Sequence, residues 1–444
     1  MKVSKRVSLG ISCIMVGLLS GLFLFRMWGV DTVSAKDESY EGLKVFTEVL
    51  SAVQKNYVDV TKNQDLLNGA IHGMVATLDP YSSYMDPDDY KDSQIDTKGE
   101  FGGLGLQVGM REKQVVVISP IDGTPAMRAG ILAGDVIVKV DDKAWEEGGS
   151  IQDAVHKMRG PSGTKVTLTI RRKEQADLLT IELIREIIQV HSVISKVIDG
   201  EIGYIRLTQF QERTANDLAR ALSKFQETGV HSLVLDLRNN PGGLLTASVE
   251  VSEQFLENGK LVVSVKGRNG VQNDFVGQGS GEWKDAPMVI LVNKGSASAS
   301  EIVSGAMQDW GRAVILGAQT FGKGSVQTIL PLSDGSALRL TTAKYYTPKG
   351  RSIADVGVSP DITVNEREGS DVSKEKDPSS GQGNHSKAGS EIKAGEDTPA
   401  VKQNSQVDEE KEKKDIPLQK AVDLLKSFKI FKGVNAGANL QLLK

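Results

Sequence analysis

The chain has 444 residues, enough for about three domains, and its 53 Lys and Arg against 57 Asp and Glu leave a net charge of −4. Because neutralising phosphates needs a basic surface, this balance argues against a dedicated nucleic-acid-binding protein. The single cysteine, Cys13, lies in an N-terminal apolar run, and the five histidines show no metal-ligand spacing. We therefore expect no disulfide, no cysteine nucleophile, no metal site and no cofactor.

The N-terminus predicts an export signal. Residues 7–25 carry no charge, and a short basic flank precedes them: Lys2, Lys5 and Arg6. As a helix this run would reach about 28 Å, close to the hydrocarbon thickness of about 30 Å, with its positive flank in the cytoplasm. The rest of the protein would then be extracytoplasmic, in the periplasm or at the cell exterior. Because Val33-Ser34-Ala35 offers a cleavage site, residues 1–36 are interpreted as a cleaved signal peptide or a retained membrane anchor.

Residues 37–98 predict a helical region. Apolar residues recur at helical spacing in its first part: Leu43, Phe46, Val49, Leu50 and Val53. A second helix near residues 66–78 should end at Asp79-Pro80. Residues 99–190 differ, because they are rich in glycine and contain four short β-branched runs and one helix near residues 151–158.

Residues 191–364 alternate apolar strands with amphipathic helices, which predicts layered α/β packing. Residues 365–414 are mainly Lys, Glu, Asp, Ser, Gly and Gln without an aromatic residue, so we expect a disordered linker. The tail, 415–444, should contain a short helix that Asp415 caps and that docks on the body through an apolar stripe: Leu418, Ala421, Val422 and Leu425.

A glycine-rich loop opens the 99–190 region. Gly103-Leu104-Gly105-Leu106 can turn several N–H groups toward one point, where they would hold a carboxylate, and the following strand can pair with an extended peptide. An ordinary glycine-rich hairpin is the alternative for this loop alone. The downstream residues resemble the PDZ pattern, and PDZ domains bind the C-termini of other proteins: Ala126, Ala129-Gly130-Ile131, Gly134-Asp135 and Ile137.

Two stretches that follow apolar strands are candidates for chemistry. DLRNNPGG (Asp236–Gly243) places two glycines beside a helix start, which suits an oxyanion hole, although a plain strand-to-helix turn would look the same. NKGSASASEIVSGAM (Asn293–Met307) places Ser298 near a helix N-terminus, where unpaired N–H groups and the helix dipole favour a nucleophile and its oxyanion. Simple N-capping by a serine is the alternative there.

A third stretch, FGKGSVQ (Phe321–Gln327), carries Lys323 between two glycines. If Lys323 is buried near Ser298, desolvation disfavours its ammonium, and the neutral amine can take the serine proton. A surface lysine in a turn is the alternative. Residues 317–323 also match GxxxxGK, but Gly324 replaces the Ser or Thr of a nucleotide-binding P-loop. No GxSxG motif supports a Ser-His-Asp hydrolase, although a distant histidine is left open.

Together these motifs resemble the carboxyl-terminal processing proteases, also called tail-specific proteases. The resemblance rests on a PDZ pattern followed by GYIRL, DLRNNPGG, GSASASEI and FGKGSVQ, with YYTPKGRSI and GVSPDI near the end of the core. It implies an α+β or α/β multidomain protein, with a PDZ domain (99–190) beside a crotonase-like α/β protease core (191–364). The long linker is less typical of the family, which leaves the role of the C-terminal helix in doubt.

The resemblance also implies the site. Ser298 matches the nucleophile, Lys323 the general base and Gln327 the residue that orients the lysine. Backbone N–H groups of Gly243 and Ala299 would form the oxyanion hole. The predicted protein is a serine endopeptidase that recognises C-terminal tails of extracytoplasmic proteins.

Regulation and partners are further expectations. A PDZ domain next to a protease could block the active site or deliver substrate to it, and Arg159 at the end of the PDZ helix is a candidate contact to the core. A solvent-exposed arginine is the alternative there. The expected partners are peptides with free C-termini, the membrane, an adaptor protein and other copies of the same protein. A catalytically inactive PDZ scaffold is the alternative function, against which the intact set of Ser298, Lys323 and Gln327 argues.

Overall fold

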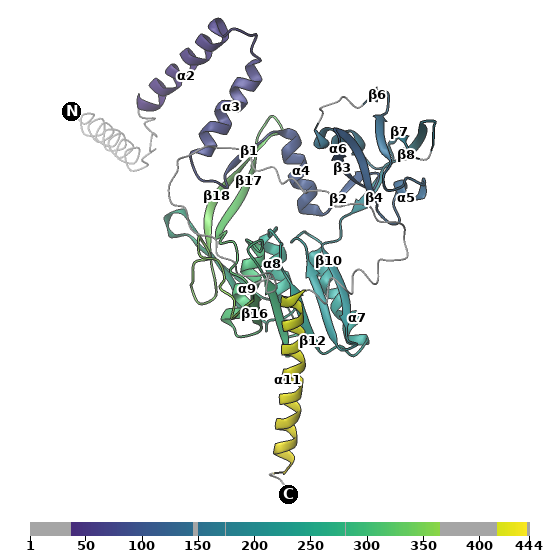
Figure 1. Cartoon of the computed structure of the whole chain (residues 1–444). Helices are drawn as coiled ribbons and strands as arrows, with labels where there is room; N and C mark the ends of the chain where they lie inside the picture. The colour runs from purple at the N-terminus through teal and green to yellow at the C-terminus, as the bar shows by residue number, and fades with distance from the viewer. Residues whose placement is uncertain (1–36, 145–149, 174, 280, 365–414, 442–444) are drawn as a thin grey trace, which may run out of the picture. The chain divides into compact units, whose positions relative to one another are not determined.

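The computed structural model describes residues 37–144, 150–173, 175–279, 281–364 and 415–441 (Figure 1). The predicted export signal (1–36) and the whole predicted linker (365–414) lie outside these residues. The protein divides into two compact units, with the boundary between Leu78 and Asp79. The described ranges contain no helix that is both long and apolar enough to span a membrane.

The first unit contains two helices, α2 (Asp37–Asn56) and α3 (Asn63–Ala76). Both were predicted. The apolar stripe of α2 is largely exposed within this unit, as Leu43, Phe46 and Val49 illustrate.

The second unit begins with a turn and a short strand, β1 (Ser83–Met85), before α4 (Pro87–Lys98). The Asp86 carboxylate caps α4 by accepting hydrogen bonds from the backbone N–H groups of Asp88 and Asp89. The predicted helical region, 37–98, thus also contains a strand that was not predicted, β1. This strand forms because it pairs with a distant one, with Ser83 opposite Arg339.

Residues 100–189 form an antiparallel sheet that two helices accompany, α5 (Pro125–Arg128) and α6 (Ile151–Met158). The sheet order is β3-β4-β5-β7-β8, and β6 adds to β5. Four strands follow the four predicted β-branched runs: β4 (Gln114–Pro120), β5 (Val136–Val140), β7 (Lys165–Arg171) and β8 (Leu179–Ile184). The sheet also contains β3 (Leu106–Arg111) and the short β6 (Lys143–Ala144). A separate pair, β2 (Glu100–Gly103) and β9 (Glu186–Gln189), joins this module to the rest of the protein on both sides.

The larger module is built on a six-stranded sheet of order β10-β11-β12-β15-β16-β19. Five strands are parallel, and β10 pairs antiparallel with β11. The strands are β10 (Val193–Ile198), β11 (Ile202–Leu207), β12 (Ser232–Asp236), β15 (Met288–Val292), β16 (Val314–Gly317) and β19 (Ile362–Thr363). Its central strands are buried on both faces, as is usual for a parallel sheet.

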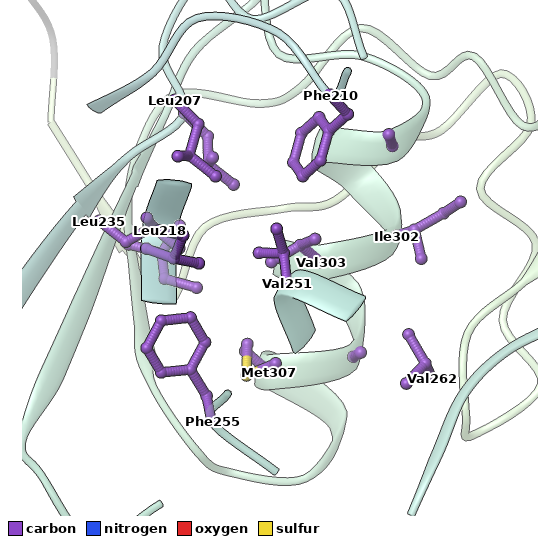
Figure 2. Close-up of a cluster of buried hydrophobic side chains, with 14 of the residues drawn as sticks. Leu207, Phe210, Leu218, Leu235, Val251, Phe255, Val262, Ile302, Val303 and Met307 are labelled. Atoms are coloured by element: carbon purple, nitrogen blue, oxygen red, sulfur yellow. The ribbon is translucent and has the colours of Figure 1, made fainter. Parts of the chain in front are cut away.

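Helices cover one face of this sheet: α7 (Thr214–Glu227), α8 (Leu245–Glu253) and α9 (Ala299–Asp309). Figure 2 shows that α9 lies inside the resulting core, where Val303 lies beside Val251 and Met307 beside Phe255, while Ile302 is on the opposite side of the helix. Because α9 is surrounded, its N-terminus has a fixed position.

The other face is covered by α11 (Ile416–Gln441). The predicted stripe on this helix is buried there: Leu418, Ala421, Val422 and Leu425. The Asp415 carboxylate accepts a hydrogen bond from the Leu418 N–H at 3.1 Å, so the predicted cap is present. The expectation of a short helix was wrong, because α11 has 26 residues.

A second sheet completes the module. It contains β13 (Leu261–Gly267), β14 (Gln272–Val276), β17 (Ser325–Pro331) and β18 (Ala337–Tyr346), and a short 3-10 turn, η1 (Arg268–Gly270), joins β13 to β14. The long strand β18 pairs with β1, β13 and β17. The α/β multidomain fold that was predicted is therefore confirmed.

Candidate active site

Three loops lie at the carboxyl ends of the neighbouring parallel strands β12, β15 and β16. They contain the Pro-Gly-Gly turn after β12, Ser298 after β15 and Lys323 after β16. Carboxyl ends of parallel strands lie at one edge of a sheet, which is where open α/β sheets bind ligands. The sheet order therefore brings the three predicted motifs to one edge.

Ser298 sits at the N-cap of α9 in a strained conformation, with φ 54° and ψ −112°. A non-glycine residue keeps such a conformation only where its surroundings hold it. Here Ser296 Oγ donates to the Leu237 carbonyl at 2.8 Å, and Ser300 Oγ donates to the Asn240 carbonyl at 3.0 Å. Ser298 is thus held at a helix N-terminus, nearly buried but still 8% exposed.

The Pro-Gly-Gly turn packs against this serine. A Cβ at Gly242 would lie 2.8 Å from Ser298 Cβ, and one at Gly243, where φ is 141°, would lie 2.1 Å from the Phe210 carbonyl oxygen. Within the described residues, the N–H groups of Gly243 and Ala299 donate no hydrogen bond to the protein. Two unpaired N–H groups next to a serine hydroxyl provide what an oxyanion hole requires.

Lys323 lies in the loop that follows β16. Burial lowers the pKa of its ammonium, the positive charge of Arg339 lowers it further, and the Glu301 carboxylate partly opposes both. Its Nζ lies over the Tyr81 ring, 5.2 Å from the centroid. Among the described residues no hydrogen bond joins Lys323 Nζ to Ser298 Oγ. The lysine is thus easier to deprotonate than a surface lysine, but its amine rests on an aromatic ring and not on the serine.

Gln327 lies on β17, near the lysine loop. Its Nε2 donates to Thr341 Oγ1 at 2.8 Å and to Ser325 Oγ at 3.2 Å. Its Oε1 is buried and has no hydrogen-bond partner within the described residues. Buried acceptors are normally hydrogen-bonded, so this oxygen is suited to accept a hydrogen bond from a lysine ammonium.

Glu301 was not predicted as a site residue. It is fully buried in the first turn of α9. One carboxylate oxygen accepts from the N–H of Gly322 at 2.7 Å and from Thr320 Oγ1 at 2.5 Å. The other accepts from the N–H of Ser298 at 2.8 Å and of Lys323 at 3.0 Å. Burial raises the pKa of Glu301, and the four hydrogen bonds, which favour the carboxylate, only partly oppose this shift. Glu301 thus ties the serine loop to the lysine loop, and the S-x-x-E capping pattern was its sequence signal.

Tyr345 was also missed. It lies on β18, is buried, and places its hydroxyl within hydrogen-bonding reach of Ser298. Burial raises its pKa to about 12, although the contact with Ser298 opposes this shift. The hydroxyl therefore stays neutral at physiological pH. Its role depends on a pairing of distant segments, for which a single sequence gives no signal.

The alternative chemistries do not match this geometry. A P-loop needs a helix after its lysine, but β17 follows Lys323. No hydrogen bond or ion pair in the described ranges links a histidine to Ser298. Across the same ranges, no cluster of three or more His, Cys, Asp or Glu could hold a metal ion.

The predicted peptide-binding loop joins β2 to β3. The carbonyls of Leu104 and Gly105 accept hydrogen bonds from the N–H groups of Ala126 and Ile121, at 2.9 and 2.8 Å. The N–H groups of Leu104 and Gly105 donate no hydrogen bond within the described residues. Among the strands that the structure describes, β3, which starts at Leu106, pairs only with β4, so its other edge can accept a further strand.

Arg159 lies at the C-cap of α6 and contacts α4 rather than the 191–364 core. Its Nη1 donates to Asp92 Oδ1 at 2.6 Å, and its guanidinium stacks over the Phe101 ring at 4.7 Å. On the same helix α4, Ser93 Oγ accepts a hydrogen bond from Arg339 of β18 at 3.1 Å. The contact expected between Arg159 and the core is therefore indirect and passes through α4.

The chain is similar to known protein families over most of its length. Residues 201–364 match peptidase family S41, residues 102–183 match the PDZ domain, and residues 29–89 match the activating protease CtpB N-terminal domain. A carboxy-terminal-processing protease of Bartonella bacilliformis is 48% identical over 340 residues, covering 75% of this chain and 77% of that protein. A probable CtpA-like serine protease of Staphylococcus saprophyticus is 39% identical over 337 residues, covering 76% and 68%.

Among solved structures, the photosystem II D1 C-terminal processing protease is 33% identical, with a TM-score of 0.43, and the match covers 72% of this chain and 92% of that one. The sequence relationship to the curated proteases extends over most of both proteins. The chain therefore belongs to peptidase family S41, and it is a PDZ-containing serine peptidase of the carboxy-terminal-processing proteases.

Proposed function

We propose that this protein is an endopeptidase in which Ser298 is the nucleophile and Lys323 is the general base. The observation that carries the proposal is the strained Ser298, held at the N-terminus of a buried helix beside two free N–H groups. The lowered pKa of Lys323 supports it, because a base must be neutral to accept a proton.

The reaction would run as an acyl transfer. Neutral Lys323 Nζ takes the proton of Ser298 Oγ as this oxygen bonds to the scissile carbonyl carbon. The N–H groups of Gly243 and Ala299 stabilise the resulting oxyanion. The lysine then gives its proton to the leaving amine, and water releases the acyl group from the serine. Gln327 would hold the lysine in line through its unpaired Oε1.

Variants of the dyad test this function. Ser298→Ala and Lys323→Ala should each reduce peptide cleavage at least a thousandfold, while thermal unfolding shows a folded protein. Because the two groups act as one unit, the double variant should be little worse than either single one. Lys294→Ala, at an exposed lysine that follows β15, is the matched control and should cleave normally. Full activity of Lys323→Ala would refute the mechanism.

The pH dependence of cleavage provides a second test of the base. A lysine whose pKa is lowered in the folded protein loses its proton as pH rises through that lowered value. We therefore expect kcat/KM to rise with pH and to level off below the ordinary lysine pKa of about 10.4. A rate that falls over this alkaline range would contradict a lysine base.

The PDZ module would recognise the tail of the substrate. The free N–H groups of Leu104 and Gly105 can hold a terminal carboxylate, with Gly103 and Leu106 flanking them, and the open edge of β3 can pair with the peptide backbone. A catalytically inactive scaffold would bind tails in the same way, so binding without cleavage by the intact protein would favour that alternative.

We place the protein outside the cytoplasm on sequence grounds. The uncharged run 7–25 behind a basic flank is the supporting feature. Addition of a protease to spheroplasts, in which only the cytoplasmic membrane encloses the cell, tests this location, with a cytoplasmic protein as control. Protection of the protein in intact spheroplasts would contradict it.

A further inference from the structure

We infer that Tyr81 is a positioning residue that holds the Lys323 side chain in a resting place, which the lysine must leave before it can act on Ser298. This inference rests on the proposed role of Lys323 as the base. It assigns a role to the turn between α3 and β1, which none of the predicted motifs includes.

The contact itself is the first observation. Lys323 Nζ lies 5.2 Å from the centroid of the Tyr81 ring, within the range of a cation–π interaction. The face of an aromatic ring attracts an ammonium and has no such preference for a neutral amine. Tyr81 therefore favours the protonated lysine, which cannot act as a base.

The turn that carries Tyr81 is fixed, so the ring has a defined place. Asp79 Oδ1 accepts from the N–H groups of Tyr81 and Ser82, both at 2.8 Å. Ser82 Oγ donates to the other oxygen of Asp79 at 2.7 Å and accepts from the N–H of Thr341 at 3.1 Å. The turn is thus fastened to β18.

The second observation is the empty acceptor on Gln327. Thr341 Oγ1 holds the Gln327 amide nitrogen, so the Gln327 side chain is oriented from the same residue that fastens the turn. Its Oε1 is nevertheless buried without a partner among the described residues. Leaving a buried acceptor unpaired costs free energy, and the lysine ammonium is the donor type that would remove this cost. In the structure the ammonium therefore lies on the Tyr81 ring, while the Gln327 acceptor that the proposed mechanism assigns to it is unfilled.

Charges around Lys323 come from two further elements. Arg339 on β18 disfavours the ammonium, and Glu301 on α9 favours it. Arg339 also donates to Ser93 Oγ on α4, at 3.1 Å. The ring attraction therefore acts together with burial, Arg339 and Glu301 on the pKa of the same ammonium, so a change at Tyr81 should appear in the pH profile.

Fluorinated phenylalanines at position 81 provide the test in the full-length protein. Fluorine withdraws electrons from the ring face and weakens cation–π attraction with little change in shape. Tyr81→Phe should keep the pH profile. Replacing Tyr81 with 3,4,5-trifluorophenylalanine should move the rise of kcat/KM to lower pH by about half to one unit. Below the midpoint this is a gain of about three- to tenfold in rate. Mono- and difluorophenylalanine at the same position should give intermediate shifts.

The same series in a Ser298→Ala background separates this inference from the proposed function. The pH dependence of Lys323 modification by a small amine-reactive reagent, followed by peptide mapping, needs no turnover. It should shift in the same order as the cleavage profile. Suppose that the pH dependence of modification shifts while that of cleavage does not. This result would support the contact between the ring and Lys323 but refute Lys323 as the base. No shift in either measurement would overturn the role of Tyr81. Trifluorophenylalanine at the exposed Tyr57 is the control and should change neither.

Discussion

At the scale of single residues, the site contains groups whose conformation or burial costs free energy in the folded protein. The Ser298 conformation costs about 1–3 kcal/mol. Burial of Lys323 disfavours its charged form, and burial of Glu301 does the same. Each of these costs falls on a group that the proposed mechanism places at the reacting atoms or uses to fix their position. The surrounding hydrogen bonds between the three loops have to offset them.

Glu301 should be the most sensitive of the positioning residues. In Glu301→Gln one oxygen becomes an NH2 group, which cannot accept from the two donors that it faces. An unpaired buried donor costs about 1–3 kcal/mol. If this loosens Ser298 and Lys323 relative to each other, kcat should fall by about 5- to 150-fold while KM changes little. Steady-state kinetics with a short peptide measures the split.

Two further measurements distinguish positioning from a general loss of fold. Glu257→Gln, at an exposed glutamate, should leave kcat unchanged. Thermal unfolding of Glu301→Gln should still be cooperative. If kcat stays normal while the protein is only less stable, the link between the two loops is structural and not part of catalysis.

At the scale of elements, a part-buried charged cluster joins the start of α11 to the core, while the pairs further along the helix, such as Lys426–Asp199, are exposed. Arg238 donates from Nη1 and Nη2 to the two oxygens of Asp415, both at 2.8 Å, and also binds Asp236. Tyr204 donates its hydroxyl to Asp236 at 2.8 Å. Arg238 directly precedes the Asn-Asn-Pro-Gly-Gly turn. Docking of α11 thus holds the residue that precedes the Pro-Gly-Gly turn.

Asp415→Asn should remove the ion pair with Arg238 and keep the helix cap, because Asn caps helices as well as Asp does. Loss of charge-assisted hydrogen bonds should lower the free energy of unfolding by about 1.5–3 kcal/mol. Asp415→Ala should lose about 1 kcal/mol more, since the cap also goes. Urea unfolding measures both. Asp199→Asn, at an exposed pair with Lys426, is the control and should change little.

The sign of the pH dependence adds a check on this pair. Burial acts to raise the pKa of Asp415, but the hydrogen bonds and charge of Arg238 outweigh it, so the pKa lies below its ordinary value. The pair therefore stabilises the fold above about pH 4 and loses this contribution as pH falls through the lowered pKa. Asp415→Asn should not show that loss. Equal acid sensitivity of both proteins would exclude the ion pair as its source.

The sequence predicted those helices and strands that have an apolar pattern of their own. The β-branched runs became β4, β5, β7 and β8, and the amphipathic patterns became α7 and α9. The short strands β1 and β19 were missed, because each forms only against a partner distant in the sequence. The same holds at the site. Ser298 and Lys323 stand in recognisable motifs, whereas Tyr345 and Tyr81 reach them only through the pairing and attachment of β18.

At the scale of the whole second unit, α4 connects the PDZ module to the lysine. Arg159 binds Asp92 on one side of this helix, and Arg339, whose charge acts on Lys323, binds Ser93. A tail that shifts the PDZ module could therefore change the charge around the base. Such an effect is limited by the difference in affinity of the tail for the two arrangements, typically about 1–3 kcal/mol.

The carboxylate of the tail should control both binding and activity. A peptide with a free C-terminus should bind the Ser298→Ala protein at least tenfold more tightly than its amidated twin, because only the carboxylate can use the free N–H groups of Leu104 and Gly105. The same acid peptide, added to the active protein, should raise or redirect cleavage of a separate substrate.

At Gly105, φ is +75° and a Cβ would lie 2.2 Å from Thr124 Cβ, so Gly105→Glu must distort the loop and also adds a negative charge. This variant should lose both effects, whereas Gly163→Glu, at an open glycine turn elsewhere in the module, should keep them. Fluorescence anisotropy with the acid and amide peptides measures the binding, and equal affinities would show that this loop does not read the carboxylate.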